Sequence, residues 1–176
     1  MQRLLYLLIL VSLIGLSGCA SNASVAQMAY KQQIATNPHN LNLVKAITVR
    51  NVSGGHETNP LWTPQISNEN FKQALVNSLQ QANLYSETSS PRYVLTAELL
   101  MLDQPMLGID ITTSCQVRYS LLDTKRDKTI YQDTILTSHT TTMGEALVAV
   151  ERFKKAVEGA AKANIQKLLQ ALYALP

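Results

Sequence analysis

The stretch that decides the fold is residues 110–122, DITTSCQVRYSLL, in which apolar and polar side chains alternate almost without exception. Alternation with a period of two is typical of a β-strand that buries one face and exposes the other. It predicts a strand over this range. The residues expected to face the core are Ile111, Thr113, Cys115, Val117, Tyr119 and Leu121.

Two neighbouring segments pair naturally with this strand. Residues 92–102 alternate in the same way and should turn Tyr93, Leu95, Ala97, Leu99 and Met101 inward. The charged run 123–128 is typical of a hairpin turn, and residues 129–141 return as a Thr-rich strand that is polar enough to be a sheet edge. Because their connections are hairpin-length, these three strands are predicted to be antiparallel.

Two helices flank this group of strands. Ser67 is a good N-cap for a helix over residues 68–82, and Asn83 suits the left-handed position that ends it. A final helix is predicted over residues 143–175, with an apolar stripe typical of a core-facing helix. The stripe contains Leu147, Val150, Phe153, Val157, Ala161, Asn164, Ile165, Leu168 and Leu172.

Residues 43–52 are rich in β-branched side chains and indicate a first strand, which Ser53-Gly54-Gly55 ends. The order is therefore β-α-β-β-β-α. It predicts an α+β two-layer sandwich, in which two helices cover one face of a four-stranded, mostly antiparallel sheet.

The N-terminus has the parts of an export signal: Arg3, an apolar run over residues 4–14, and the small-residue segment Leu16-Ser17-Gly18-Cys19. The alternative is a membrane-spanning anchor, but such a helix needs roughly 20 apolar residues. The predicted division is a signal peptide over residues 1–18, a polar tether over 19–41, and one domain over 42–176.

Leu16-Ser17-Gly18-Cys19 closely resembles the lipobox of bacterial lipoproteins. This resemblance implies cleavage before Cys19 and lipid attachment at that residue. Ala20 in the following position, where Asp would signal inner-membrane retention, implies the outer membrane and a domain that faces the periplasm. The competing interpretation of the two cysteines is a disulfide; lipidation of Cys19 instead leaves Cys115 as a buried, unpaired thiol.

The sequence offers no pattern that indicates catalysis or a metal. His39, His56 and His139 lie in three separate segments without ligand spacing, and no Gly-x-Ser-x-Gly motif occurs. The 15 basic side chains barely outnumber the 12 acidic ones, so nothing indicates nucleic acid as a partner. We therefore expect a protein that is not an enzyme and uses no cofactor.

Two loops are candidate contact sites. The connection 104–109 carries Met106, Leu107 and Ile109, which are unusually apolar for a hairpin tip and suit insertion into a partner or lipid; alternatively the tip tucks under the preceding long loop. The long loop 53–66 carries Trp62, an aromatic anchor of the kind that interfaces favour. The alternative is that Trp62 plugs one end of the core.

The element order behind a lipobox resembles YajG-like lipoproteins and the lipopolysaccharide-assembly lipoproteins and, more loosely, lipoprotein activators of peptidoglycan synthases. The resemblance implies an accessory or binding subunit of an outer-membrane assembly or transport system, whose partner is a membrane protein complex. The alternatives are a periplasmic carrier of lipid or glycan and an activator of a cell-wall synthase.

Overall fold

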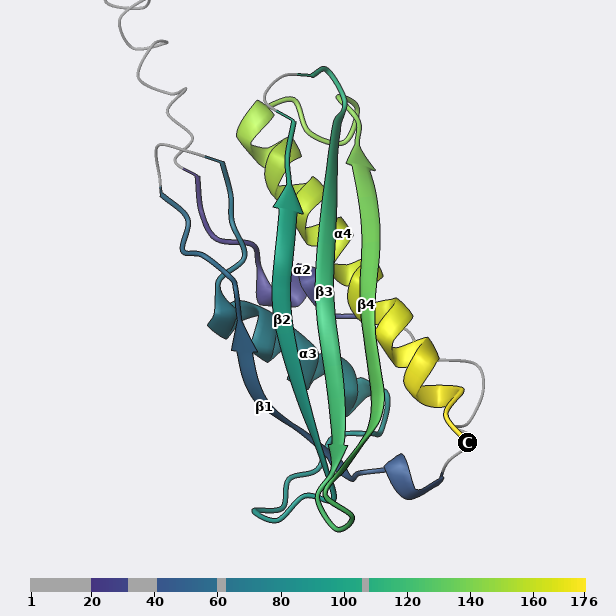
Figure 1. The fold of residues 1–176 in the computed structure, drawn as a ribbon. Coiled ribbons are helices and arrows are strands. Elements are labelled where there is room, and N and C mark those ends of the chain that lie inside the picture. Colours follow the sequence, from purple (N-terminus) through teal and green to yellow (C-terminus); the bar gives the residue numbers. More distant parts are fainter. Residues whose placement is uncertain (1–19, 32–40, 60–62, 106–107) are drawn as a thin grey trace, which may run out of the picture.

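The computed structural model describes residues 20–31, 41–59, 63–105 and 108–176. Its elements follow one another as shown in Figure 1. They are α2 (Val25–Met28), a 3-10 turn (Leu41–Leu43), β1 (Ile47–Ser53), α3 (Asn68–Gln81), β2 (Tyr93–Asp103), β3 (Ile111–Asp123), β4 (Lys128–Thr141) and α4 (Ala149–Tyr173).

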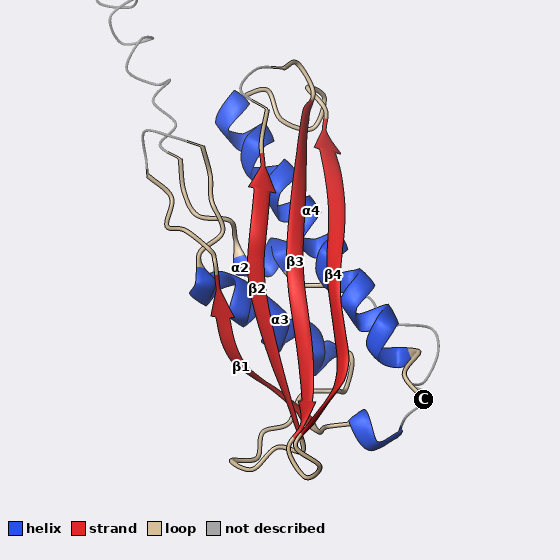
Figure 2. Ribbon diagram, in the orientation of Figure 1, coloured by secondary structure: helices blue, strands red, loops and turns tan. Residues whose placement is uncertain are grey.

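The four strands form one sheet in the order β1-β2-β3-β4, and the helices pack on one of its faces (Figure 2). This confirms the predicted α+β fold. Strands β2, β3 and β4 are antiparallel, whereas β1 pairs with β2 in parallel, so the sheet is mixed. The parallel pair arises because the chain crosses over from β1 to β2 through α3, which lies against the sheet.

The alternation of β3 is confirmed at every predicted inward position, because residues 111, 113, 115, 117, 119 and 121 are all buried. Cys115 is a free cysteine, and burial raises the pKa of its thiol to about 12. It therefore behaves as a small apolar core residue and not as a reactive thiolate.

The inward prediction for β2 is wrong at Met101, whose side chain is 40% exposed. The pairing with β3 shifts register between Leu99 and Met101, so the extra residue moves the following side chains to the opposite faces. Leu102 pairs with Cys115 and packs against the core in place of Met101.

Helix α3 forms as predicted. The Ser67 hydroxyl accepts a hydrogen bond from the Asn70 N–H at 3.2 Å and caps the helix. At the other end Asn83 takes the left-handed conformation, with φ of 56°, and Leu84 behind it is fully buried.

Helix α4 begins at Ala149, so the predicted start at residue 143 is wrong, and Leu147 lies outside the apolar stripe with 82% of its surface exposed. The Glu145 carboxylate accepts hydrogen bonds from the N–H and the hydroxyl of Thr142. These bonds close a single turn over residues 142–145 that does not continue into α4. Arg152 then donates to the carbonyls of Ala146 and Leu147 at 2.8 and 2.9 Å. These bonds use carbonyls that a longer helix would need.

Gly159 does not interrupt α4. A Cβ at this position would come within 2.1 Å of the His139 ring, so the glycine lets β4 approach the helix closely. The residue is therefore explained by packing between the strand and the helix.

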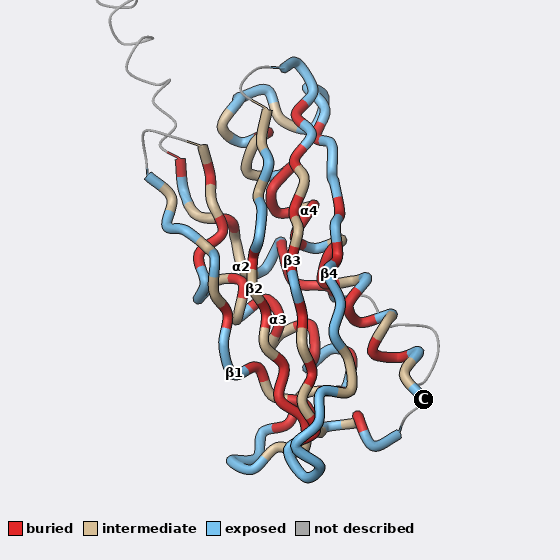
Figure 3. Tube along the Cα trace, in the orientation of Figure 1, coloured by how far each residue is buried: buried red, intermediate tan, exposed pale blue. Residues whose placement is uncertain are grey.

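The polar tether predicted for residues 19–41 is wrong for residues 20–31, which pack against the domain. Ala23 and Met28 are fully buried and belong to the core (Figure 3 shows the buried segments in red). The Tyr30 N–H donates to the Ser78 hydroxyl at 2.9 Å. A few apolar side chains among polar ones are enough to hold this segment against α3 and α4. The rest of the predicted tether, residues 32–40, lies outside the described residues.

Candidate functional site

Several loops meet at the end of the sheet where β1, β2 and β4 end and β3 begins, toward the upper end of Figure 1. We call this region the loop end. It is made up of residues 20–24, 54–59, 63–66, 104–105, 108–110 and 142–148.

Hydrogen bonds join the loop end into one surface. The Ala23 N–H donates to the Gln65 carbonyl at 3.0 Å, and the Thr58 N–H donates to the Asn22 side chain at 2.7 Å. The Gln104 amide donates to the Pro64 carbonyl at 2.7 Å, which links the β2–β3 connection to the connection between β1 and α3. The loop end is therefore a structured surface formed by segments far apart in the sequence.

Glycine allows the turn into this region. Gly54 has φ of +80°, and a Cβ there would lie 2.0 Å from the Leu99 carbonyl oxygen. The Gly55 N–H then donates to the Asn68 side chain at 2.8 Å, so the loop is fixed to the start of α3. The predicted end of the first strand at these residues is confirmed.

The loop end exposes apolar side chains at positions that the sequence analysis did not predict. Ile109, the one predicted contact residue that the structure describes, is 72% exposed; Cys19, Trp62, Met106 and Leu107 lie outside the described residues. The β4–α4 connection adds three more exposed apolar side chains, with exposed fractions of 51%, 82% and 50%: Met143, Leu147 and Val148.

The sequence analysis missed these three residues because it placed all of them in a helix over residues 143–175, in which the spacing of Leu147 fits the apolar stripe. Gly144 was the available signal, since glycine disfavours a helix interior by about 1 kcal/mol. When a helix begins only after such a glycine, an apolar residue next to the glycine can lie outside the helix and need not be buried with its apolar stripe.

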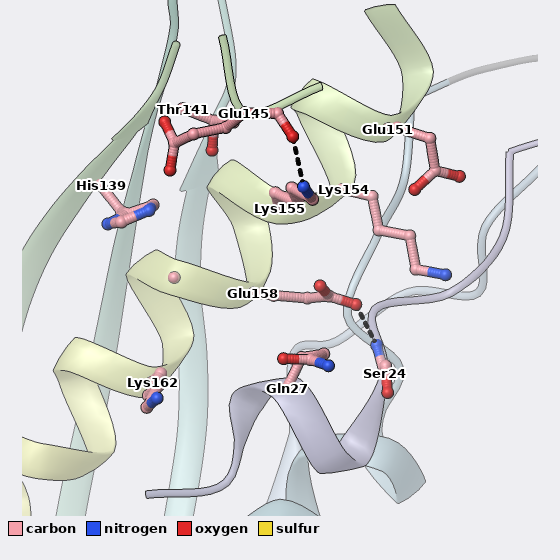
Figure 4. Close-up of a pocket in the computed structure, with 11 residues that line it drawn as sticks. Ser24, Gln27, His139, Thr141, Glu145, Glu151, Lys154, Lys155, Glu158 and Lys162 are labelled. Carbon is pink, nitrogen blue, oxygen red and sulfur yellow. Dashed lines mark hydrogen bonds between the residues drawn. The ribbon is translucent and has the colours of Figure 1, made fainter. Parts of the chain in front are cut away.

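A charged cleft of about 540 Å³ adjoins the loop end, between the end of β4, the N-terminal half of α4 and α2 (Figure 4). The Lys155 ammonium donates to the Glu145 carbonyl. The Glu158 carboxylate accepts the Ser24 N–H at 2.7 Å, and the Lys154 ammonium donates to the Ser21 hydroxyl at 2.8 Å. The cleft thus holds the first residues of the domain against α4.

Glu158 is the buried acid of this cleft. Burial raises the pKa of its carboxyl, while the hydrogen bond from Ser24 and the neighbouring charge of Lys154 act in the opposite direction. Its oxygen is engaged with the backbone, which indicates a structural role.

Neither metal binding nor membrane spanning emerges from the described ranges. Over residues 20–31, 41–59, 63–105 and 108–176, no three His, Cys, Asp or Glu side chains are grouped so that they could hold a metal ion. Within those same ranges no helix has the length and apolar character needed to cross a bilayer.

No protein-family model matches this chain, and no curated protein matches it. Solved structures share its fold. A candidate lipoprotein from Caulobacter crescentus is 14% identical, with a TM-score of 0.53 over 74% of this chain and 89% of its own. The PelC dodecamer protein from Paraburkholderia phytofirmans is 16% identical, with a TM-score of 0.53 over 78% and 95%. A Xanthomonas campestris protein is 10% identical, with a TM-score of 0.52 over 81% and 94%. At these identities the likeness establishes the fold alone.

Proposed function

We propose that this protein is a lipid-anchored, non-enzymatic envelope lipoprotein. Cys19 carries the lipid, the domain faces the periplasm from the outer membrane, and the protein serves as an accessory or binding subunit of an assembly or transport system there. Its partner is a membrane protein complex, and Trp62, Met106 and Leu107 are proposed contacts with it.

The observation that carries this proposal is the position of the lipobox relative to the fold. Ala20 follows Cys19 directly and is buried, with 6% of its surface exposed. The described domain begins directly after Cys19, so cleavage before Cys19 would remove none of its residues. The candidate lipoprotein from Caulobacter crescentus has the same fold, which supports the proposal.

A second candidate function, a carrier of lipid or glycan, is less well supported. Between the sheet and the helices the described residues are closely packed, and Phe71, Leu75 and Leu95 are fully buried there. The charged cleft lies at the surface and its lining is mostly polar, which does not suit an acyl chain.

The anchor is tested by expressing the full chain in a Gram-negative host. Cys19→Ala should leave an unprocessed precursor without lipid mass, whereas Cys115→Ala, which changes the buried cysteine, should be processed and lipidated normally. Membrane fractionation and intact mass measure both outcomes. Normal processing and membrane retention of Cys19→Ala would refute the proposal.

The accessory role is tested on the lipidated protein after crosslinking in intact cells. A membrane protein should be recovered with the wild type and lost with Trp62→Ala or Met106→Asp, while the thermal unfolding midpoint stays close to that of the wild type. Recovery of protein-bound lipid without any membrane protein would favour the carrier instead.

A further inference from the structure

The exposed apolar residues of the loop end lie on two connections that are joined to each other. Ile109 belongs to the β2–β3 connection, and Met143, Leu147 and Val148 belong to the β4–α4 connection. The Met143 N–H donates to the Asp110 carboxylate at 3.2 Å, which holds the two connections together. Exposed apolar residues that gather on one end of a domain mark an interaction surface.

The chain enters the domain at this same end. Ser21 is bonded to Lys154 of α4, Ser24 to Glu158, and Asn22 to the loop that contains Thr58. Since Ala20 is buried and adjacent to Cys19, a lipid on Cys19 leaves no free linker between the bilayer and the domain. The loop end is the part of the molecule that the anchor brings to the membrane.

We infer that the loop end rests on the lipid bilayer and that Ile109, Met143, Leu147 and Val148 contact its interfacial region. This inference rests on the proposed lipid anchor. Of the two contacts that the sequence left open for the 104–109 connection, a partner or lipid, it assigns Ile109 to lipid.

The contact is apolar in character. Acidic side chains outnumber basic ones around the loop end: Glu57, Asp103, Asp110 and Glu145 are exposed there, whereas of the two nearby lysines Lys155 is exposed and Lys154 is half-buried. A polybasic patch that would seek anionic lipid is therefore missing from the described part of this end. The contact should form on zwitterionic vesicles and be insensitive to salt.

Weak apolar contacts are sufficient here because the anchor makes them intramolecular. A short link to a bound group gives an effective concentration of about millimolar. A handful of side chains that would not hold a free domain on a membrane can then keep a tethered domain in one orientation.

The test uses the full lipidated protein in phosphatidylcholine vesicles, with an environment-sensitive fluorophore on a single introduced cysteine. Lipid occupies Cys19 and Cys115 is buried, so only the new thiol reacts. Leu147→Cys should give blue-shifted emission that lipids carrying a quencher in their acyl chains reduce. Arg126→Cys, in the exposed hairpin at the other end of β3, should give the emission of a fluorophore in water.

Two further variants isolate the apolar contact. With the fluorophore on Met143→Cys, a Leu147→Asp substitution should abolish the blue shift without lowering the thermal midpoint, because Leu147 is 82% exposed. Inserting about ten Gly and Ser residues between Cys19 and Ala20, a reach of roughly 15–20 Å, should reduce the blue shift while the anchor persists.

The outcomes separate the two proposals. If Cys19 is free to react, the lipid anchor fails and the inference fails with it. If the protein is anchored but the fluorophores on Leu147→Cys and Arg126→Cys report the same aqueous environment, the inference alone is overturned. A shift that appears only with anionic lipid would also overturn it, since that result indicates an electrostatic contact.

Discussion

Asn164 shows how one polar residue organises the core. It lies in the apolar stripe of α4 and is fully buried, yet its amide donates to the Ile135 carbonyl at 2.8 Å and its oxygen accepts the Tyr119 hydroxyl at 2.8 Å. The residue therefore fixes α4 against both β3 and β4. Burial raises the pKa of Tyr119 well above its ordinary value, so the phenol stays protonated and remains a donor.

Replacing this residue should be costly. Asn164→Leu leaves the Tyr119 hydroxyl without its acceptor, and a buried polar group without a partner costs about 1–3 kcal/mol. We expect the free energy of unfolding, measured by urea denaturation, to fall by at least that amount. Gln170→Leu, at an exposed position of the same helix, is the control. Equal stability of the two variants would contradict the role assigned to Asn164.

Glu158 should make stability depend on pH. Its folded-state pKa is raised above the ordinary 4.5, so the folded protein binds this proton more tightly than the unfolded chain does. Stability is therefore greatest below about pH 4.5 as far as this group is concerned, and falls as pH rises through the folded-state pKa.

Glu158→Gln removes this titration but keeps an oxygen for the Ser24 N–H. The thermal midpoint of the variant relative to the wild type should rise between about pH 4 and pH 7, as calorimetry would measure. Glu87→Gln removes the same charge from an exposed site between α3 and β2 whose charge does not contribute to the pKa shift of Glu158, and so separates the effect of net charge. A difference that stays constant over this pH range would disprove the contribution of Glu158.

At the scale of elements, the short helix α2 is an integral part of the fold. Met28 is fully buried within the core cluster, although the surrounding sequence is polar. Met28→Ala should lower the free energy of unfolding by about 2–5 kcal/mol, because truncation leaves a cavity. Gln27→Ala, exposed in the same helix, should change it little. Denaturant unfolding compares the two, and similar midpoints would show that α2 is only loosely attached.

Element boundaries followed the sequence where local signals agreed with packing. The cap Ser67 and the left-handed Asn83 delimited α3 within a residue, since both act through neighbouring backbone. The start of α4 and the inward face of β2 after Leu99 differ from what the sequence predicted. The first depends on Arg152 reaching back to two carbonyls, and the second on a bulge set by pairing with β3.

At the scale of the whole molecule, the loop end gathers segments that are separated by more than a hundred residues in the chain. The Ser21 hydroxyl and the Lys154 ammonium meet there, and so do the β2–β3 and β4–α4 connections. The order β1-β2-β3-β4 brings these segments to one end, because β1 and β2 run in parallel toward it and β3 and β4 connect through the other end.

The sequence by itself determined the element order, the α+β class and the buried face of β3, and it predicts lipidation at Cys19 from its resemblance to a lipobox. These depend on short-range periodicity, capping and motif chemistry, which a local stretch of residues contains in full. Only the tertiary structure decided that residues 20–31 belong to the domain, that Leu147 is exposed beside Ile109, and that both lie at the end where the chain enters. Contacts between residues far apart in sequence decide such placements, and no local pattern records them.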